Sequence, residues 1–131
     1  MTRASREKGR RAEIELCKLL AEELGIDVAR NVDQARAGGA DCLMVPGYAL
    51  EVKRREVLSR PAWWRQAVDQ AVKVGCEPMV WYRRNRQDWR ALVTAQNPDG
   101  YLDVSRAEAL DAMRDKLARL YGIYPQMKAA A

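Results

Sequence analysis

Hydrophobic positions at helical spacing mark the first element of the chain. We expect a helix from about Ser5 to Leu24, ended by Gly25, because apolar residues recur there at intervals of three or four. This apolar stripe consists of Leu16, Cys17, Leu20 and Leu24. Glu13 falls on the same stripe, so one carboxylate is predicted to face inward near the start of the helix. The alternative is that Glu13 lies at the helix edge and only favours the positive end of the helix dipole.

The rest of the chain alternates between apolar runs typical of strands and two further helical segments. We expect strands over residues 26–32, 41–45, 48–54, 78–83 and 89–94, and helices over 61–74 and 105–121. Pro61 suits the first turn of a helix, and Ser105 with Glu108 forms a capping-box pattern that opens the last helix. Residues 97–100, Asn-Pro-Asp-Gly, predict a turn. The order α-β-β-β-α-β-β-α indicates an α/β domain with helices packed on a mixed central sheet.

The length of 131 residues fits one domain with a single hydrophobic core. We expect residues 1–131 to form that domain, with residues 1–8 and 125–131 flexible. No apolar run approaches the roughly 18 residues of a membrane span, and the basic N-terminus lacks the apolar stretch of a secretory signal. Cys17, Cys42 and Cys76 are odd in number and lack metal-site spacing, so we expect reduced core cysteines in a cytoplasmic protein, bacterial or phage-encoded.

The net charge of +5 comes from 23 Lys and Arg residues against 18 Asp and Glu residues, and it is unevenly distributed. Basic residues gather over residues 3–11, 53–65 and 83–90, whereas the signs balance from residue 99 onward. This asymmetry favours a polyanionic partner, most commonly nucleic acid, over ordinary solvated charge. The chain has no histidine, which excludes Ser-His-Asp and Cys-His catalysis, His-ligated zinc and HNH-type nuclease chemistry.

Two charged residues, Glu51 and Lys53, lie in the apolar run 48–53. Because side chains alternate across a strand, Glu51 and Lys53 share one face while Leu50 and Val52 point to the other. Burying a carboxylate and an ammonium together is unfavourable unless a ligand or a reaction uses them. A divalent metal ion is such a ligand, because it needs oxygen donors and its bound water needs a cation nearby.

Three carboxylates, those of Glu13, Asp41 and Glu51, are therefore candidates for one site without a histidine or cysteine companion. All-oxygen ligation selects Mg²⁺ or Mn²⁺ over zinc. A metal of this kind polarises a phosphate oxygen and lowers the pKa of bound water, and Lys53 could orient that water or stabilise developing charge. A Gly-rich loop with Arg36 precedes Asp41; it could hold a DNA strand, or it is simply a loop entering a strand.

Pro46-Gly47, between the second and third expected strands, raises a difficulty of register. A strict two-residue turn would pair Asp41 with Val52, and directly paired residues share a face, so Asp41 would point away from Glu51. A shared site then requires a three-residue or bulged connection, or an Asp41 released from the pairing. Pro-Gly favours a type II turn, which fits a tight hairpin poorly and so favours an irregular connection.

The acidic motif has a known counterpart. Gly-Ala-Asp at residues 39–41, followed by Leu-Glu-Val-Lys at 50–53, resembles the signature of the PD-(D/E)XK nuclease superfamily, with alanine where the motif often has proline. Residues 8–16, Lys-Gly-Arg-Arg-Ala-Glu-Ile-Glu-Leu, are similar to the first helix of Holliday junction resolvases, whose catalytic glutamate falls on Glu13. Residues 63–67, Trp-Trp-Arg-Gln-Ala, resemble phage-type resolvases and related small nucleases.

This resemblance covers about residues 5–93 and implies a restriction-endonuclease-like fold with magnesium-dependent cleavage of phosphodiester bonds. It implies metal ligation by Asp41, Glu51 and the Val52 carbonyl, with Glu13 binding the metal directly or through water. It assigns Lys53 to orienting the nucleophile, and either Gln66 or Gln70 to supporting the site from the second helix. The residues expected to bind DNA are Lys8, Arg10, Arg11, Arg36, Arg54 and Arg55.

We therefore expect a structure-specific DNA endonuclease similar to Holliday junction resolvases, with Mg²⁺ as cofactor, Mn²⁺ as the alternative, no small-molecule cofactor and no membrane partner. A junction resolvase cuts two strands symmetrically, so a homodimer is expected. Two alternatives stay open: a non-catalytic DNA-binding protein on the same fold, and a restriction-like or nicking nuclease. Trp63 and Trp64 could stack on bases, although one core ring and one interface ring is the favoured interpretation.

Overall fold

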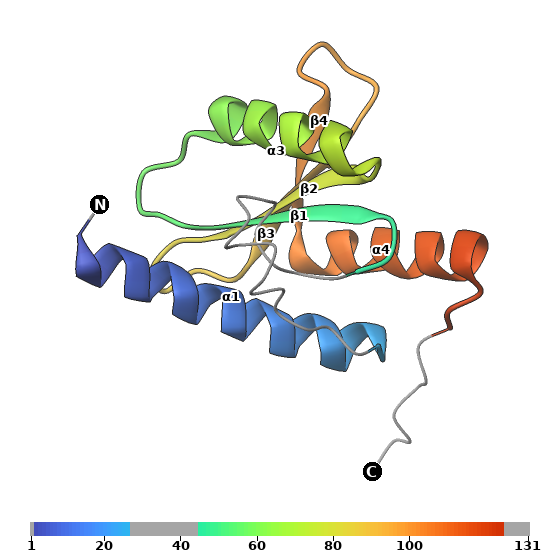
Figure 1. Ribbon diagram of the computed structural model, residues 1–131, viewed down its shortest axis with the longest axis horizontal. Coiled ribbons are helices and arrows are strands. Elements are labelled where there is room, and N and C mark those ends of the chain that lie inside the picture. The colour runs from blue at the N-terminus through green and yellow to red at the C-terminus, as the bar shows by residue number, and fades with distance from the viewer. Residues whose placement is uncertain (1, 27–44, 125–131) are drawn as a thin grey trace.

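The computed structural model of the protein describes residues 2–26 and 45–124, which form helices on both faces of a mixed sheet (Figure 1). The elements are α1 (Arg3–Leu24), β1 (Tyr48–Arg54), α3 (Arg60–Val74), β2 (Glu77–Arg83), β3 (Arg90–Thr94), β4 (Tyr101–Ser105) and α4 (Arg106–Tyr121). The strands lie in the order β1-β2-β3-β4. β1 and β2 are parallel and are joined through α3, whereas the other neighbours are antiparallel.

The fold has three layers. The sheet is the middle layer, with α3 on one face and α1 and α4 on the other (Figure 1). β2 is one of the two inner strands of the described sheet, and its side chains alternate between two cores. Val80 and Tyr82 pack against Trp63 and Trp64 of α3. Trp81 faces the opposite way, into the larger core that α1 and α4 share with β1 and β3. Both α3 tryptophans are therefore core residues.

Local signals in the sequence account for where the helices begin and end. The hydroxyl of Thr2 accepts a hydrogen bond from the Ser5 amide at 3.1 Å and caps α1. Ser105 and Glu108 form the predicted capping box at the start of α4. Each helix ends at a glycine in the left-handed conformation, which closes the last turn. These glycines are Gly25, Gly75 and Gly122.

A tight β-turn over residues 45–48 leads into β1. The Tyr48 amide donates to the Val45 carbonyl at 3.1 Å, and Gly47 has a φ of 83°, as the third position of a type II turn requires. A Cβ atom at Gly47 would also come within 2.7 Å of the Tyr121 hydroxyl, so both the positive φ and this contact favour glycine here. The pairing of Asp41 beyond this turn lies outside the described residues.

The predicted elements agree closely with the described part of the fold. Six of them, over residues 5–24, 48–54, 61–74, 78–83, 89–94 and 105–121, are confirmed, with no end shifted by more than two positions. The strands expected over 26–32 and 41–45 lie outside the described residues apart from Ile26 and Val45. The sequence prediction missed β4. Residues 3–8 are helical, and the predicted flexibility of the two termini stays a prediction.

No helix in the described ranges is long and apolar enough to cross a membrane.

Asp103 of β4 ties the edge of the sheet to three other elements. Its carboxylate accepts hydrogen bonds from the Tyr82 hydroxyl at 2.5 Å, from Arg60 at 2.6 Å and from Arg90 at 2.9 Å. These donors come from β2, α3 and β3. Burial alone would raise the pKa of Asp103, but the three hydrogen bonds outweigh it and hold the pKa below the ordinary value of 3.8.

Replacing Asp103 with asparagine is expected to lower the free energy of unfolding at neutral pH by about 1 to 3 kcal/mol, because charge-assisted hydrogen bonds are lost. The folded-state pKa of Asp103 lies below its unfolded-state value. Its contribution is therefore complete well above pH 3.8 and is lost as the pH falls through the folded-state pKa. The difference in Tm between wild type and Asp103→Asn should shrink accordingly in acid. Asp69→Asn, an exposed carboxylate on α3, is the control, and equal Tm values for the two variants at neutral pH would contradict the assignment.

Candidate active site

Glu51 and Lys53 lie on the face of β1 that α3 covers. In the parallel register Glu51 lies opposite Val80 and Lys53 lies opposite Tyr82, and both partners belong to the core beneath α3. The intervening Val52 points into the core of α1 and α4. The alternation predicted from the sequence is therefore confirmed, and one short strand separates the acid and the amine from the larger core.

Glu51 is 4% exposed, and among the described residues it is the one charged side chain that is buried. Taking a carboxylate out of water costs free energy, and proteins retain such groups mainly where the charge has a use. The donor chemistry fits a hard cation, because a carboxylate supplies the oxygen ligands that Mg²⁺ and Mn²⁺ prefer. An ammonium two residues along the same strand face suits the same chemistry.

Gln66 of α3 holds the Lys53 side chain in place. The Lys53 Nζ donates a hydrogen bond to the Gln66 Oε1 at 3.0 Å. A lysine has four rotatable side-chain bonds, so this contact restricts where its charge lies. Of the two glutamines that the sequence left open, Gln66 is the one for which the structure gives a contact with Lys53.

Glu13 of α1 approaches the sheet from the side opposite to α3. Its side chain is half-buried and one carboxylate oxygen, Oε2, is fully enclosed, so the group points into the protein as its apolar stripe predicted. Over residues 2–26 and 45–124, His, Cys, Asp and Glu side chains form no group of three that could hold a metal. Asp41 and Arg36 lie outside these residues. The ligand set and the role of the Val52 carbonyl stay predictions.

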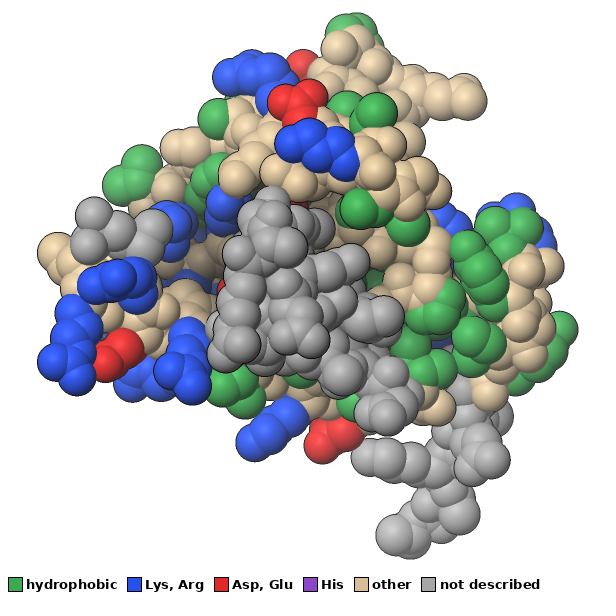
Figure 2. Space-filling model, in the orientation of Figure 1, with side chains coloured by type: hydrophobic (Ala, Val, Ile, Leu, Met, Phe, Trp, Pro, Cys, Tyr) green, Lys and Arg blue, Asp and Glu red, His purple; other side chains and the backbone are tan. Residues whose placement is uncertain are grey.

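Basic side chains gather at the end of the molecule where α1 begins, as Figure 2 shows. A cleft of about 350 Å³ opens there between the first turns of α1 and the segment that follows β1. Its lining residues are Ser5, Lys8, Arg54, Arg55 and Glu56. The cleft joins the first two basic segments of the sequence directly after the strand that carries Glu51 and Lys53. Its basic lining suits the negative charge of a phosphate group.

The six residues expected to bind DNA differ in how exposed their charges are. Arg10, Arg11 and Arg55 are exposed, and Lys8 is half-buried in the wall of the cleft. The Arg54 side chain is only 10% exposed. Its guanidinium donates to the Arg83 carbonyl at 3.2 Å, to Glu56 at 3.3 Å and to the Asn85 side chain. Arg54 therefore joins two loops in the structure as it stands.

Sequence reasoning missed Glu56, which is the one acid in the cleft wall. Its Oε1 accepts a hydrogen bond from the Asn85 backbone amide at 2.7 Å. This hydrogen bond is the main reason why the pKa of Glu56 lies below its ordinary value. The available signal was a single carboxylate directly after three consecutive basic residues. Its partner Asn85 is far away in sequence, so the pairing itself had no local signal.

Comparisons with known proteins give a family and a fold for the chain. A model of the family described as phage putative PDDEXK endonuclease matches residues 4–118. The structure is similar to that of Hjc, a Holliday junction resolvase from the archaeal hyperthermophile Archaeoglobus fulgidus. The TM-score is 0.54 and the identity 24%, over 79% of this chain and 96% of that chain. No curated protein matches the chain. The structural similarity shows a shared fold, which confirms the predicted restriction-endonuclease-like α/β architecture.

Proposed function

Because the chain belongs to the family of phage PDDEXK endonucleases, as its acidic motif predicted, we propose that it hydrolyses phosphodiester bonds in DNA with a divalent metal ion as cofactor. The observation that carries this proposal is the buried carboxylate of Glu51 beside Lys53 on one strand face. Gln66 orients the Lys53 ammonium through a hydrogen bond of 3.0 Å. An acid and a positioned cation on a rigid strand are what such a reaction needs from its protein.

Glu51 and Asp41 would hold the ion, together with the Val52 carbonyl and with Glu13 directly or through water. Their oxygen-only donor set favours Mg²⁺, with Mn²⁺ as the alternative. When bound, the ion supplies Lewis-acid activation of the phosphate and of the attacking water. The buried position of Glu51 keeps bulk water away from this carboxylate and so strengthens its interaction with a cation.

Lys53 serves as the chain's own catalytic cation in this proposal. An ammonium has three donors, and Gln66 uses one of them. The others can hydrogen-bond to the attacking water or to a phosphate oxygen on which negative charge develops. The hydrogen bond to Gln66 fixes the position of the charge before the substrate arrives, so little reorganisation is needed during the reaction.

Backbone phosphates of the DNA would be held at the basic end of the molecule. Lys8 and Arg55 line the cleft of about 350 Å³, and Arg10 and Arg11 extend the positive surface along α1. We include Arg36 in this set and give Arg54 a positioning role, because its guanidinium is hydrogen-bonded within the protein. Contacts to phosphates fix the position of DNA without reading its sequence.

The preferred substrate in our proposal is branched DNA such as a four-way junction. The fold is shared with a protein described as a Holliday junction resolvase. A four-way junction offers two symmetric positions for cleavage, which a two-fold homodimer would address. The cytoplasm is where we expect the protein to meet such DNA.

Wild-type protein is expected to cleave a four-way junction in Mg²⁺ faster than linear, nicked or flapped DNA. Glu51→Gln should lower this cleavage by at least about 100-fold, because it removes a charged metal ligand while keeping the shape of the side chain. Asp41→Asn should behave in the same way. Mg²⁺ should raise the Tm of the wild type but not that of Glu51→Gln. Glu22→Gln, an exposed acid on α1, is the control.

The outcomes of this comparison separate the alternatives. Tight binding of DNA without cleavage by the wild type would favour a non-catalytic DNA-binding protein. Equal rates on linear and four-way DNA would favour a restriction-like or nicking nuclease. Unchanged cleavage by Glu51→Gln would remove this residue from the site.

Replacing Lys53 with methionine should lower kcat by about 100-fold or more and leave the Mg²⁺-induced rise in Tm unchanged, because the Lys53 ammonium acts on the reaction rather than on metal binding.

Gln66→Ala should lower kcat by about 10-fold with KM unchanged, since the Lys53 ammonium stays but loses its hydrogen bond. Gln70→Ala is the matched control one turn along α3, and an equal effect of Gln66→Ala and Gln70→Ala would contradict the assignment.

Removing the positive charge of the cleft with Lys8→Ala/Arg55→Ala should raise the Kd for DNA by about 10-fold and reduce the slope of log K against log salt by roughly 2. The measurement uses the Glu51→Gln background without divalent ions, so that no DNA is cut. Lys73→Ala/Arg119→Ala removes the same charge from exposed sites on α3 and α4 and should change the Kd little. Equal salt slopes for the two double variants would show that the cleft does not contact phosphates.

A further inference from the structure

The loop between β2 and β3 carries exposed positive charge beside the proposed site. It comprises residues 84–89, and the side chains of Arg84 and Arg86 are both exposed. Neither has an ion-pair partner within the described ranges, whereas Arg54, Arg60 and Arg90 are paired with carboxylates there. The charge of the two loop arginines is therefore directed at solvent rather than used inside the fold.

Hydrogen bonds connect this loop to the segment that follows β1. The Asn85 amide donates to the Glu56 carboxylate at 2.7 Å, and the Arg54 guanidinium binds the Asn85 side chain and the Arg83 carbonyl. Arg54 and Glu56 also pair with each other at 3.3 Å. We call this set of Arg54, Glu56 and Asn85 the loop lock. Because the pKa of Glu56 is lowered, its carboxylate stays charged at neutral pH.

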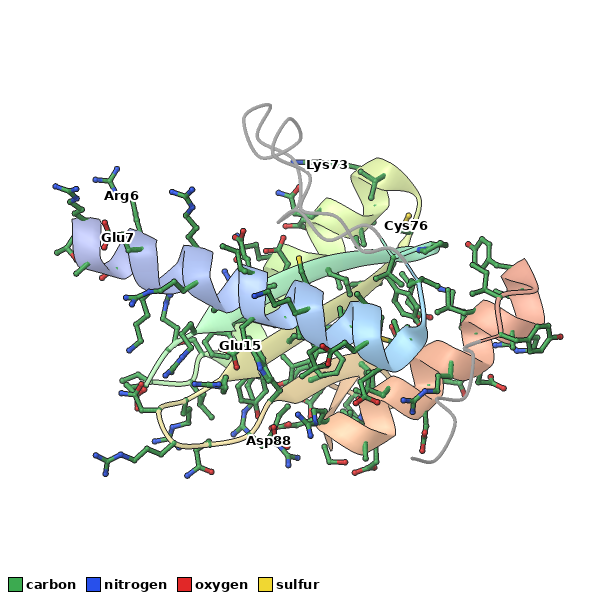
Figure 3. The ribbon with its side chains drawn as sticks, turned by 90° about the horizontal axis from the view of Figure 1, so that it is seen from below. Arg6, Glu7, Glu15, Lys73, Cys76 and Asp88 are labelled. Atoms are coloured by element: carbon green, nitrogen blue, oxygen red, sulfur yellow. The ribbon has the colours of Figure 1, made fainter. Side chains whose placement is uncertain are left out.

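A second set of contacts connects the other end of the loop to α1. Glu15 accepts hydrogen bonds from the indole nitrogen of Trp89 at 3.1 Å and from the Arg83 guanidinium. Trp89 is 2% exposed and belongs to the core. Figure 3 shows Glu15 on the side of α1 that faces the end of the loop marked by Asp88. The loop is therefore fastened at both ends, and its tip stays exposed.

The tip has an unusual backbone. Arg86 has a φ of 60°. In the described part of the chain it is the one residue other than glycine that has a positive φ. This left-handed conformation disfavours side chains other than Asn, Asp and Gly. A long side chain at this position therefore costs conformational energy that the rest of the loop has to offset.

The loop and the cleft lie at the same end of the sheet. β1 and β2 run parallel and end together, with Arg54 opposite Arg83 in the register. Glu56 lines the cleft and also holds the loop, so one carboxylate joins the two surfaces. Figure 1 shows the connections after β1 and after β2 on the side of the molecule where α1 begins. A DNA strand in the cleft would therefore pass close to Arg84 and Arg86.

We propose that the β2–β3 loop is a second phosphate-binding element, held in shape by the loop lock, which binds the DNA backbone through Arg84 and Arg86. This inference rests on the proposed function, since DNA is the ligand. It assigns binding to the loop that lies within the third basic segment of the sequence, residues 83–90. It also assigns Arg54 and Glu56 to positioning that loop.

Removing the loop charges tests the contact. Arg84→Ala/Arg86→Gly should raise the Kd for a four-way junction by about 10-fold and lower the salt slope by roughly 2, measured in the Glu51→Gln background without divalent ions. Glycine is chosen for residue 86 because the left-handed backbone accepts it, so weaker binding cannot come from a broken turn. Arg84→Lys/Arg86→Lys should retain most of the affinity. Lys73→Ala/Arg119→Ala is again the control for charge. A Kd and a salt slope for Arg84→Ala/Arg86→Gly equal to those of this control would overturn the proposal.

Two substitutions of Glu56 separate the loop lock from simple electrostatics. Glu56→Ala and Glu56→Gln both remove one negative charge from a basic surface, which by itself should strengthen binding to DNA. Glutamine keeps an acceptor oxygen for the Asn85 amide, whereas alanine does not. Glu56→Gln should therefore bind at least as tightly as the parent protein, and Glu56→Ala should bind about 3-fold to 10-fold more weakly than Glu56→Gln because the loop loses its shape. Equal affinities would overturn the positioning role.

The same measurements distinguish this inference from the proposed function. A parent protein that binds DNA but never cuts it in Mg²⁺ contradicts the nuclease proposal, while the loss of binding in Arg84→Ala/Arg86→Gly still supports the loop. Cleavage and binding by that variant at parental levels overturn the loop alone. A protein that binds no DNA overturns both. If measurement of Tm shows that the double variant is unfolded, the single variant Arg86→Gly takes its place, and its Kd and salt slope decide the outcome.

Discussion

Alternation of side chains along β1 is the constraint on which the site and the fold both depend. Leu50 and Val52 complete the core under α1 and α4, and the residues between and after them face α3. One strand of seven residues can therefore stabilise the protein with one face and carry the candidate site residues on the other. A shift of one residue in the pairing with β2 would exchange the faces, burying Glu51 and Lys53 in the larger core. Stability and the proposed chemistry thus select the same register.

Much of the fold is readable from the sequence because its signals are local. Caps and glycines set the helix ends, and apolar alternation sets β1 and β2. β4 was missed because it is short, forms an edge and carries Asp103, whose charge argues against a strand when read locally. Its carboxylate is stabilised by Tyr82, Arg60 and Arg90, which lie 13 to 43 residues away along the chain. No local pattern contains that information.

The site divides in the same way between local and long-range information. The shared face of Glu51 and Lys53 follows from strand periodicity alone, and the structure confirms it. The choice between Gln66 and Gln70 does not, because both are candidates on one helix and only the rotation of α3 against β1 brings Gln66 to Lys53. The predicted ligand Asp41 lies outside the described residues, so its contribution to a shared site stays a prediction.

Net charge is a poor guide to where this protein binds a polyanion, because the fold uses many of its arginines internally. Arg54 and Arg55 are adjacent and equivalent in the sequence, yet the first is 10% exposed and hydrogen-bonded while the second is exposed. The same division separates Arg83, paired with Glu15, from its neighbour Arg84. The binding surface is therefore formed by those of the 23 Lys and Arg residues that are left once the internally paired arginines are set aside. In this protein the internal pairs also hold the loops that carry the remaining charges, so structural and binding arginines depend on one another.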